Sequence, residues 1–222
     1  MTHLDSEITT LKNELGYMWE LVNSQLDKTV QSLTAFDKDL ALEVQEHEKR
    51  VNAIEINIDK ACEDFIALYQ PVATDLRFVL STLKINNNLE RIADIACGIA
   101  EFISDVDTGF NPDILEHMSA LHMLSLSVEM VKDLKEAHQH ENTALARTIF
   151  KRDKVLDSIN DKASNLAMDC LDRFPDQRKH TLHVLSIIRK IERIGDQSKN
   201  IAEEIIFYLD AKVIKHKKKK KE

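Results

Sequence analysis

The chain has 222 residues, a formal net charge of −8 and 43% hydrophobic residues. Its 4 glycines and 3 prolines are too few for a sheet protein, in which turns built from those residues follow every short strand. The acidic balance argues against a general nucleic-acid binder, which is normally basic. Composition therefore predicts an all-α protein with long helices and no nucleic-acid partner.

The N-terminus and the cysteines bear on where the protein acts. Residues 1–7 lack the basic start and apolar run of a signal peptide. No stretch approaches the roughly 18 apolar residues of a membrane span. Cys62, Cys97 and Cys170 are far apart and form no CxxC pair, which is typical of buried thiols in a reducing compartment. We expect a cytoplasmic protein with no direct membrane insertion.

Six helices are expected, because each proline stands at the start of a stretch with helical periodicity and two further breaks contain capping residues. Pro71, Pro112 and Pro175 mark three of these starts. Apolar residues recur along one side of each stretch, a pattern typical of long helices that pack at shallow angles. The expected ranges are 4–35, 39–69, 72–105, 112–138, 142–173 and 178–210.

The chain ends in a lysine-rich run. We expect residues 211–222 to form a basic, disordered tail. The alternative for this tail is contact with anionic lipid or with an acidic partner.

An internal repeat divides the chain into two halves. Residues 90–103 can be laid over residues 192–205 at an offset of 102, with eight of fourteen positions identical. Residues 48–52 likewise match residues 153–157, so the second expected helix corresponds to the fifth and the third to the sixth. The sequence predicts a duplication, with one three-helix bundle over residues 1–107 and another over residues 112–210.

Acidic residues four positions apart are retained in both halves. Like charges at this spacing repel each other on a helix surface by a few tenths of a kcal/mol, roughly, so their repetition suggests a bound cation. If neighbouring helices lie side by side, these pairs form two oxygen-rich clusters on the outer face, suited to Mg, Mn or Fe. The candidate metal ligands are Glu48, Asn52, Glu90, Asp94, Asp153, Asp157, Glu192 and Asp196.

Three segments carry a resemblance to a known family. They are Ala67-Leu-Tyr-Gln-Pro-Val-Ala-Thr-Asp-Leu-Arg77, Leu89-Glu-Arg-Ile-Ala-Asp94 and Ile191-Glu-Arg-Ile-Gly-Asp-Gln-Ser-Lys-Asn-Ile-Ala-Glu203. In order and spacing they resemble the PhoU family of bacterial phosphate-uptake regulators, and the resemblance spans almost the entire chain. The Gln-Pro-x-x-x-Asp-Leu-Arg segment together with the doubled Glu-Arg-Ile-x-Asp is a specific combination.

The resemblance implies two tandem three-helix PhoU repeats in a cytoplasmic homodimer. It also implies a negative regulator that couples a phosphate ABC transporter to a sensor histidine kinase, and not an enzyme. Family members can carry multinuclear iron or other metal clusters (Mn, Zn or Mg) on Glu/Asp-x-x-x-Asp motifs, which correspond here to the acidic pairs above. Asn52 replaces the usual second acid, so a weaker N-terminal cluster is expected.

Four charged residues are candidates for partner contacts. Asp75 and Arg77 lie near the start of the third expected helix, where the alternative is a carboxylate favoured by the helix dipole beside a surface arginine. Arg91 and Arg193 occupy the same position in the two repeats and lie close enough to the acidic pairs to neutralise part of their charge.

Three other functions remain open from the residues. A metal-free helical adaptor needs none of the proposed ligands. A ferritin-like di-metal enzyme requires Glu-x-x-His pairs, and none of the nine histidines has a Glu three positions before it. His180 and His183 lie one turn apart, but no neighbouring motif supports a metal there. Direct phosphate binding is disfavoured by the acidic surface unless a cation bridges the anion.

Overall fold

The computed structural model of the chain describes residues 3–214, and they are almost entirely helical, with no strand among them. The all-α prediction is therefore confirmed. The elements are α1 (His3–Ala35), α2 (Lys38–Tyr69), α3 (Ala73–Ser104), α4 (Pro112–His117), α5 (Ala120–Gln139), α6 (Thr143–Arg173), the 3-10 helix η1 (Pro175–Gln177) and α7 (Arg178–Asp210).

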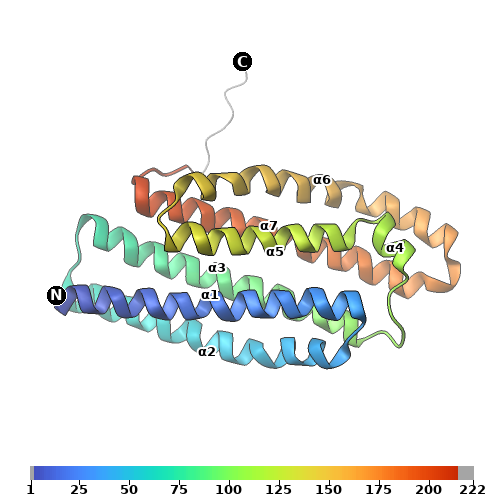
Figure 1. The fold of residues 1–222 in the computed structure, drawn as a ribbon, viewed down its shortest axis with the longest axis horizontal. Coiled ribbons are helices and arrows are strands. Elements are labelled where there is room, and N and C mark those ends of the chain that lie inside the picture. Colours follow the sequence, from blue (N-terminus) through green and yellow to red (C-terminus); the bar gives the residue numbers. More distant parts are fainter. Residues whose placement is uncertain (1–2, 215–222) are drawn as a thin grey trace, which may run out of the picture.

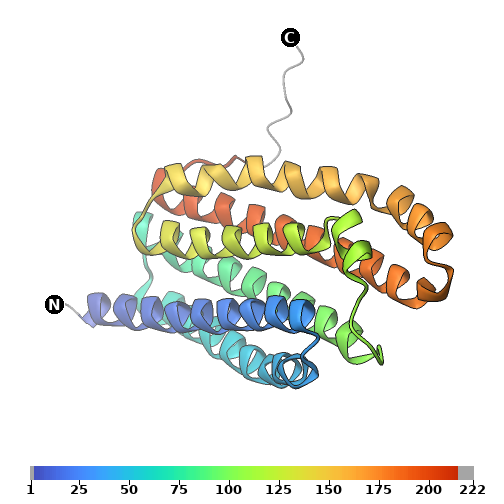
Figure 2. The same cartoon turned by 45° about the vertical axis from the view of Figure 1, so that its right-hand side comes forward.

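The long helices form two three-helix bundles. Helices α1, α2 and α3 pack together, as do α5, α6 and α7, which confirms the predicted duplication of the fold. Figures 1 and 2 show the two bundles lying against each other, with the axes of the long helices roughly aligned and consecutive long helices of a bundle antiparallel. The bundles meet mainly through α3 with α7 and α1 with α5, so the third helix of each repeat is central.

Helix boundaries follow from capping chemistry. The side chain of Asp37 accepts hydrogen bonds from the backbone N–H groups of Asp39 and Leu40, both at 3.0 Å, and so starts α2. Asn142 caps α6 in the same way through the N–H of Leu145 at 3.0 Å. Pro112 stands in the first turn of α4, where its missing N–H costs nothing.

The fourth expected helix, 112–138, was wrong in one respect, because it is divided into α4 and α5. Ser119 between them adopts a left-handed backbone conformation with φ of 56°, which ends the helical hydrogen bonding. The break lets Ile114, Leu115 and Met118 pack into the end of the bundle, and all three are buried. Local periodicity alone did not reveal this change of direction.

A single apolar core runs through both repeats. Trp19 on α1, Ile92 on α3 and Ile194 on α7 are each fully buried. The matching seams of the two repeats therefore both face inward, which fixes the sides on which the acidic residues lie.

None of the helices within residues 3–214 is long and apolar enough to cross a membrane. The lysine-rich run from residue 215 onward, on which the tail prediction depends, lies outside the described residues.

Candidate functional site

The C-terminal acidic cluster lies between α6 and α7. Asp153 and Asp157 come from α6, and Glu192 and Asp196 come from α7. Burial, followed by the charges of Asp196, Asp157 and Asp153, raises the pKa of Glu192, so the four carboxylates are close enough to repel one another. The pKa of Asp157 is raised for the same reasons, first by burial and then by Asp153. The structure thus brings together all four predicted residues of this repeat.

A lysine from α7 is also part of this cluster. The Nζ of Lys199 lies 3.0 Å from Oδ2 of Asp153 and 2.6 Å from Oδ1 of Asp196. Burial lowers the pKa of the lysine, but its hydrogen bonds to Asp196 and Asp153 raise it overall, so the ammonium stays charged. It ties α6 to α7 with a charge opposite to that of the cluster.

Asp153 departs from the outward orientation expected for the acidic residues, because it is buried, with 5% of its surface exposed. It lies against Gly195, where an added Cβ would come 3.1 Å from its Oδ1 and 2.7 Å from Cδ1 of Leu156. The missing side chain at Gly195 lets α6 approach α7 closely, and this approach covers Asp153.

The N-terminal acidic cluster lies between α2 and α3. Burial, followed by the charges of Asp94, Glu55 and Glu48, raises the pKa of Glu90, while Arg91 lowers it in part. Glu48, Glu90 and Asp94 are therefore neighbours, with Glu55 as a fourth acid that the sequence motif did not include. Asn52 is exposed, one turn after Glu48.

A cysteine in this cluster stands where the other repeat has its lysine. Cys97 and Lys199 are separated by the repeat offset of 102 residues, and each follows its Asp by three positions. The Sγ of Cys97 donates a hydrogen bond to Oε2 of Glu48 at 3.2 Å. Burial, together with this bond and the nearby acids, raises the pKa of the Cys97 thiol to about 12, so the thiol is protonated at neutral pH.

Cys97, Lys199 and Glu55 are the cluster residues that motif reasoning missed. The repeat alignment contained the signal for two of them, because it places Cys97 over Lys199 and this is the aligned pair in which one repeat gains a positive charge. Glu55 follows Glu48 by seven residues and so shares its helix face.

The two clusters differ as metal sites. In residues 3–214 no three His, Cys, Asp or Glu side chains are already arranged around a common point as metal ligands. The N-terminal set offers oxygen donors of the type that divalent ions bind, and within the described part of the chain no lysine or arginine forms an ion pair with Glu48, Glu90 or Asp94. The C-terminal set does not fit, because the ammonium of Lys199 already lies between its carboxylates.

The candidate partner residues divide into two kinds. Arg77 is half-buried and donates from Nε to the carbonyl of Tyr208 at 3.4 Å and from a terminal nitrogen to Thr74 Oγ1 at 3.1 Å. It therefore links α3 to α7, and Asp75 beside it is half-buried as well. Arg91 and Arg193 are exposed at equivalent positions of the two repeats.

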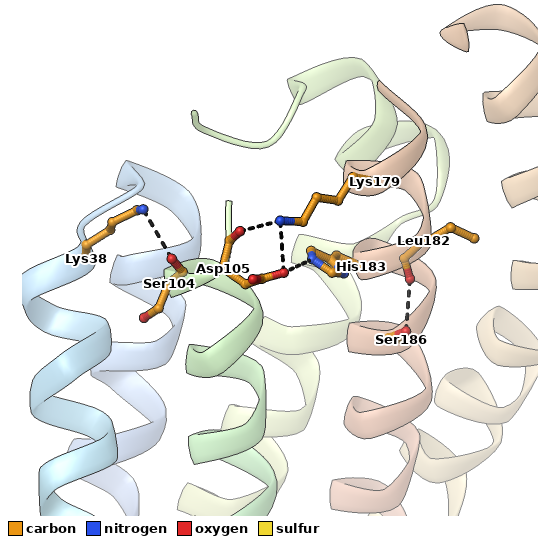
Figure 3. A network of polar contacts seen from close by, with 7 residues as sticks. All are labelled: Lys38, Ser104, Asp105, Lys179, Leu182, His183 and Ser186. Carbon is orange, nitrogen blue, oxygen red and sulfur yellow. Dashed lines mark hydrogen bonds and ion pairs between the residues drawn. The ribbon is translucent and has the colours of Figure 1, made fainter. Parts of the chain in front are cut away.

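His180 and His183, the histidine pair noted in the sequence, join α7 to the end of α3 and the segment that follows it. His183 Nε2 lies 2.8 Å from Oδ2 of Asp105 at the end of α3, and Lys179 Nζ lies 2.6 Å from the Asp105 carbonyl oxygen (Figure 3). The ring of His183 packs on Phe102 at 4.9 Å between centroids, and His180 packs similarly on Phe110. These contacts give both histidines a structural role.

Known proteins resemble this chain in both sequence and fold. A family model described as "PhoU domain" matches residues 15–103 and 120–205, one match in each repeat. The Thermotoga maritima "Phosphate-specific transport system accessory protein PhoU homolog 1" is 29% identical over 96% of this chain and 91% of its own length. The Escherichia coli "Phosphate-specific transport system accessory protein PhoU" is also 29% identical, over 96% of this chain and 87% of its length.

Solved structures agree with the sequence relatives. The crystal structure of PhoU from Pseudomonas aeruginosa superposes with a TM-score of 0.88 at 29% identity and covers 95% of this chain and 100% of that one. The phosphate transport system regulatory protein PhoU from Streptococcus pneumoniae gives a TM-score of 0.82 at 25% identity, covering 96% and 99%. Since both repeats match the family model, this chain belongs to the PhoU family.

Proposed function

We propose that this protein is an accessory regulator of phosphate uptake that represses phosphate-starvation genes when phosphate is plentiful. The observation that carries the proposal is the match of both repeats to the PhoU domain, together with relatives of nearly equal length named as phosphate transport accessory proteins. Those relatives are named accessory or regulatory proteins, which supports regulation rather than catalysis.

The regulation acts through protein contacts. A homodimer on the cytoplasmic side of the membrane contacts a phosphate ABC transporter and a sensor histidine kinase. The exposed Arg91 and Arg193 give each repeat a cation at the same place, which suits two related docking surfaces. Arg77 and the neighbouring half-buried Asp75 contribute indirectly, because Arg77 holds α3 against α7 and so fixes the relative positions of the two docking surfaces.

The N-terminal cluster is where a divalent metal ion would bind. Glu48, Glu90 and Asp94 would hold it, with the amide of Asn52 one turn from Glu48, and iron, manganese, zinc or magnesium all accept such oxygen donors. The ion would offset the repulsion that raises the pKa of Glu90 and would fix α2 against α3.

Gene deletion tests the regulatory proposal. A reporter of phosphate-starvation transcription should rise in phosphate-rich medium when the gene is deleted and return to the repressed level when the intact gene is restored. Restoration with Glu192→Ala plus Asp196→Ala should leave the reporter raised. Unchanged reporter output in the deletion strain would remove the assignment.

The docking surfaces are tested with matched arginine variants. Arg91→Ala and Arg193→Ala should each reduce capture of the transporter or of the kinase. Arg178→Ala, an exposed arginine at the start of α7, serves as the control and should leave capture unchanged. Equal capture by all three variants would exclude the two arginines from the partner surface, and light scattering would test the homodimer separately.

A further inference from the structure

We propose that Lys199 is a built-in counter-ion that takes the place of a metal ion in the C-terminal acidic cluster, so that this cluster binds no divalent cation. The claim concerns only the C-terminal repeat and does not depend on metal binding at the N-terminal cluster.

The position of the ammonium carries the inference. Lys199 and Asp196 are three residues apart on α7, while the other carboxylate, Asp153, comes from α6. The nitrogen therefore bridges two helices, as a metal ion shared between them would. Because Asp153 is buried and Lys199 is about one-third exposed (32%), the contact lies mostly below the surface. A divalent ion at that point would meet a positive charge at close range.

The charges at equivalent positions support the replacement of a metal ion by Lys199. The C-terminal set has four carboxylates and one ammonium, in Asp153, Asp157, Glu192, Asp196 and Lys199. The N-terminal set has four carboxylates, in Glu48, Glu55, Glu90 and Asp94, and neutral side chains at Asn52 and Cys97. The C-terminal set is therefore one unit less negative than the N-terminal set. Lys199 accounts for this difference, because each set has four carboxylates and, among the described residues, only the C-terminal set holds a cation in ion-pair contact with them.

Cys97 and Lys199, which are equivalent in the two repeats, also contact equivalent acidic residues. Cys97 reaches Glu48 at 3.2 Å, and Lys199 reaches the equivalent Asp153 at 3.0 Å. In the N-terminal repeat the contact is made by a neutral thiol, which adds no positive charge to the carboxylates. In the C-terminal repeat the same contact supplies a cation. A change at one position thus separates the chemistry of two clusters built on equivalent backbones.

Manganese titration of the full chain tests the proposal, with free Mn²⁺ followed by its electron paramagnetic resonance signal. Lys199→Met removes the ammonium but keeps the length of the side chain, and it should bind one more Mn²⁺ per chain than the unaltered protein. Lys199→Arg keeps the charge and should show no gain. Lys132→Met is the matched control, because Lys132 pairs with Asp27 at 2.7 Å outside either cluster, and it should show no gain.

The outcome that overturns the inference is a folded Lys199→Met protein that binds no more Mn²⁺ than the unaltered protein. A second measurement does not require that variant to fold. Asp157→Asn with Glu192→Gln keeps both partners of Lys199 and should leave Mn²⁺ binding unchanged, and loss of an ion would overturn the proposal. Glu48→Gln with Glu90→Gln tests the N-terminal cluster separately, so failure there leaves the Lys199 result standing.

Discussion

The two acidic clusters occupy equivalent places in a duplicated fold, yet they differ in chemistry. Between α6 and α7 the carboxylates surround Lys199, and the buried Asp153 accepts its hydrogen bond. Between α2 and α3 a thiol makes the corresponding contact and no cation from the described residues enters the cluster as an ion-pair partner. The comparison teaches that repetition of a motif preserves the positions of side chains but not the charge balance among them.

The largest expected effect comes from filling the space at Gly195. Gly195→Val should lower the free energy of unfolding by about 2–3 kcal/mol, because even an added Cβ would meet Leu156 Cδ1 at 2.7 Å and force α6 away from α7. Urea unfolding followed by circular dichroism measures the change. A variant as stable as the unaltered protein would show that the C-terminal cluster does not depend on this close approach.

The contact between the repeats should be sensitive to acid, because His138 on α5 packs its ring against Trp19 on α1, with 6.5 Å between the ring centroids. Burial, followed by the charge of Lys12, lowers the pKa of His138 from 6.5 to about 4, so folding favours its neutral form. Because the unfolded chain binds the proton more readily between those values, stability should be fully present above pH 6.5 and fall as the pH drops toward 4. At pH 5 the loss is about 2 kcal/mol.

Unfolding measured at pH 7.5 and pH 5 checks this prediction, with His138→Gln as the comparison. Between pH 7.5 and pH 5, the His138→Gln variant should lose about 2 kcal/mol less stability than the unaltered protein. An identical pH dependence in both proteins would show that His138 is not held neutral against the first repeat.

Removing the internal cation should have a smaller effect. Lys199→Met leaves Asp153 buried beside Asp196 without a positive partner. The free energy of unfolding should fall by about 1 kcal/mol, a modest loss because the partly exposed Lys199 is screened by solvent. Lys132→Met, which breaks an exposed pair with Asp27, should cost less. Thermal unfolding in a chelator excludes metal rescue, and equal losses in the two variants would contradict the special role of Lys199.

The smallest effect is expected at Ala93, the counterpart of Gly195. Ala93→Gly should destabilise α3 by about 0.5–1 kcal/mol, because glycine gains more freedom in the unfolded chain and no new contact replaces the lost methyl group. The measurement is the same urea titration. Stabilisation by this change would mean that the N-terminal helices are held apart by the alanine.

Much of the fold could be predicted because the repeat and the helix signals agree. The three prolines and the capping residues Asp37 and Asn142 all mark observed starts or breaks. The division at Ser119 could not be predicted, since a left-handed residue there is stabilised by burial of Met118 against distant parts of the chain.

Most acidic residues of the candidate site were predictable, but the charge balance of the site was not. Spacing placed Glu90 with Asp94 on one helix, and Asp153 with Glu192 on adjoining helices. The sequence alone did not reveal that Lys199 turns toward Asp153 instead of solvent, because that choice depends on the distance between α6 and α7. Nor did the sequence reveal that Arg77, a candidate for a partner surface, donates to the Tyr208 carbonyl and so links α3 to α7.

Metal analysis of paired variants tests the difference between the clusters most directly. Glu48→Gln with Glu90→Gln should abolish Mn²⁺ binding by the otherwise unaltered protein, whereas Asp157→Asn with Glu192→Gln should leave it intact. Loss of Mn²⁺ from the second pair with retention in the first would contradict the account.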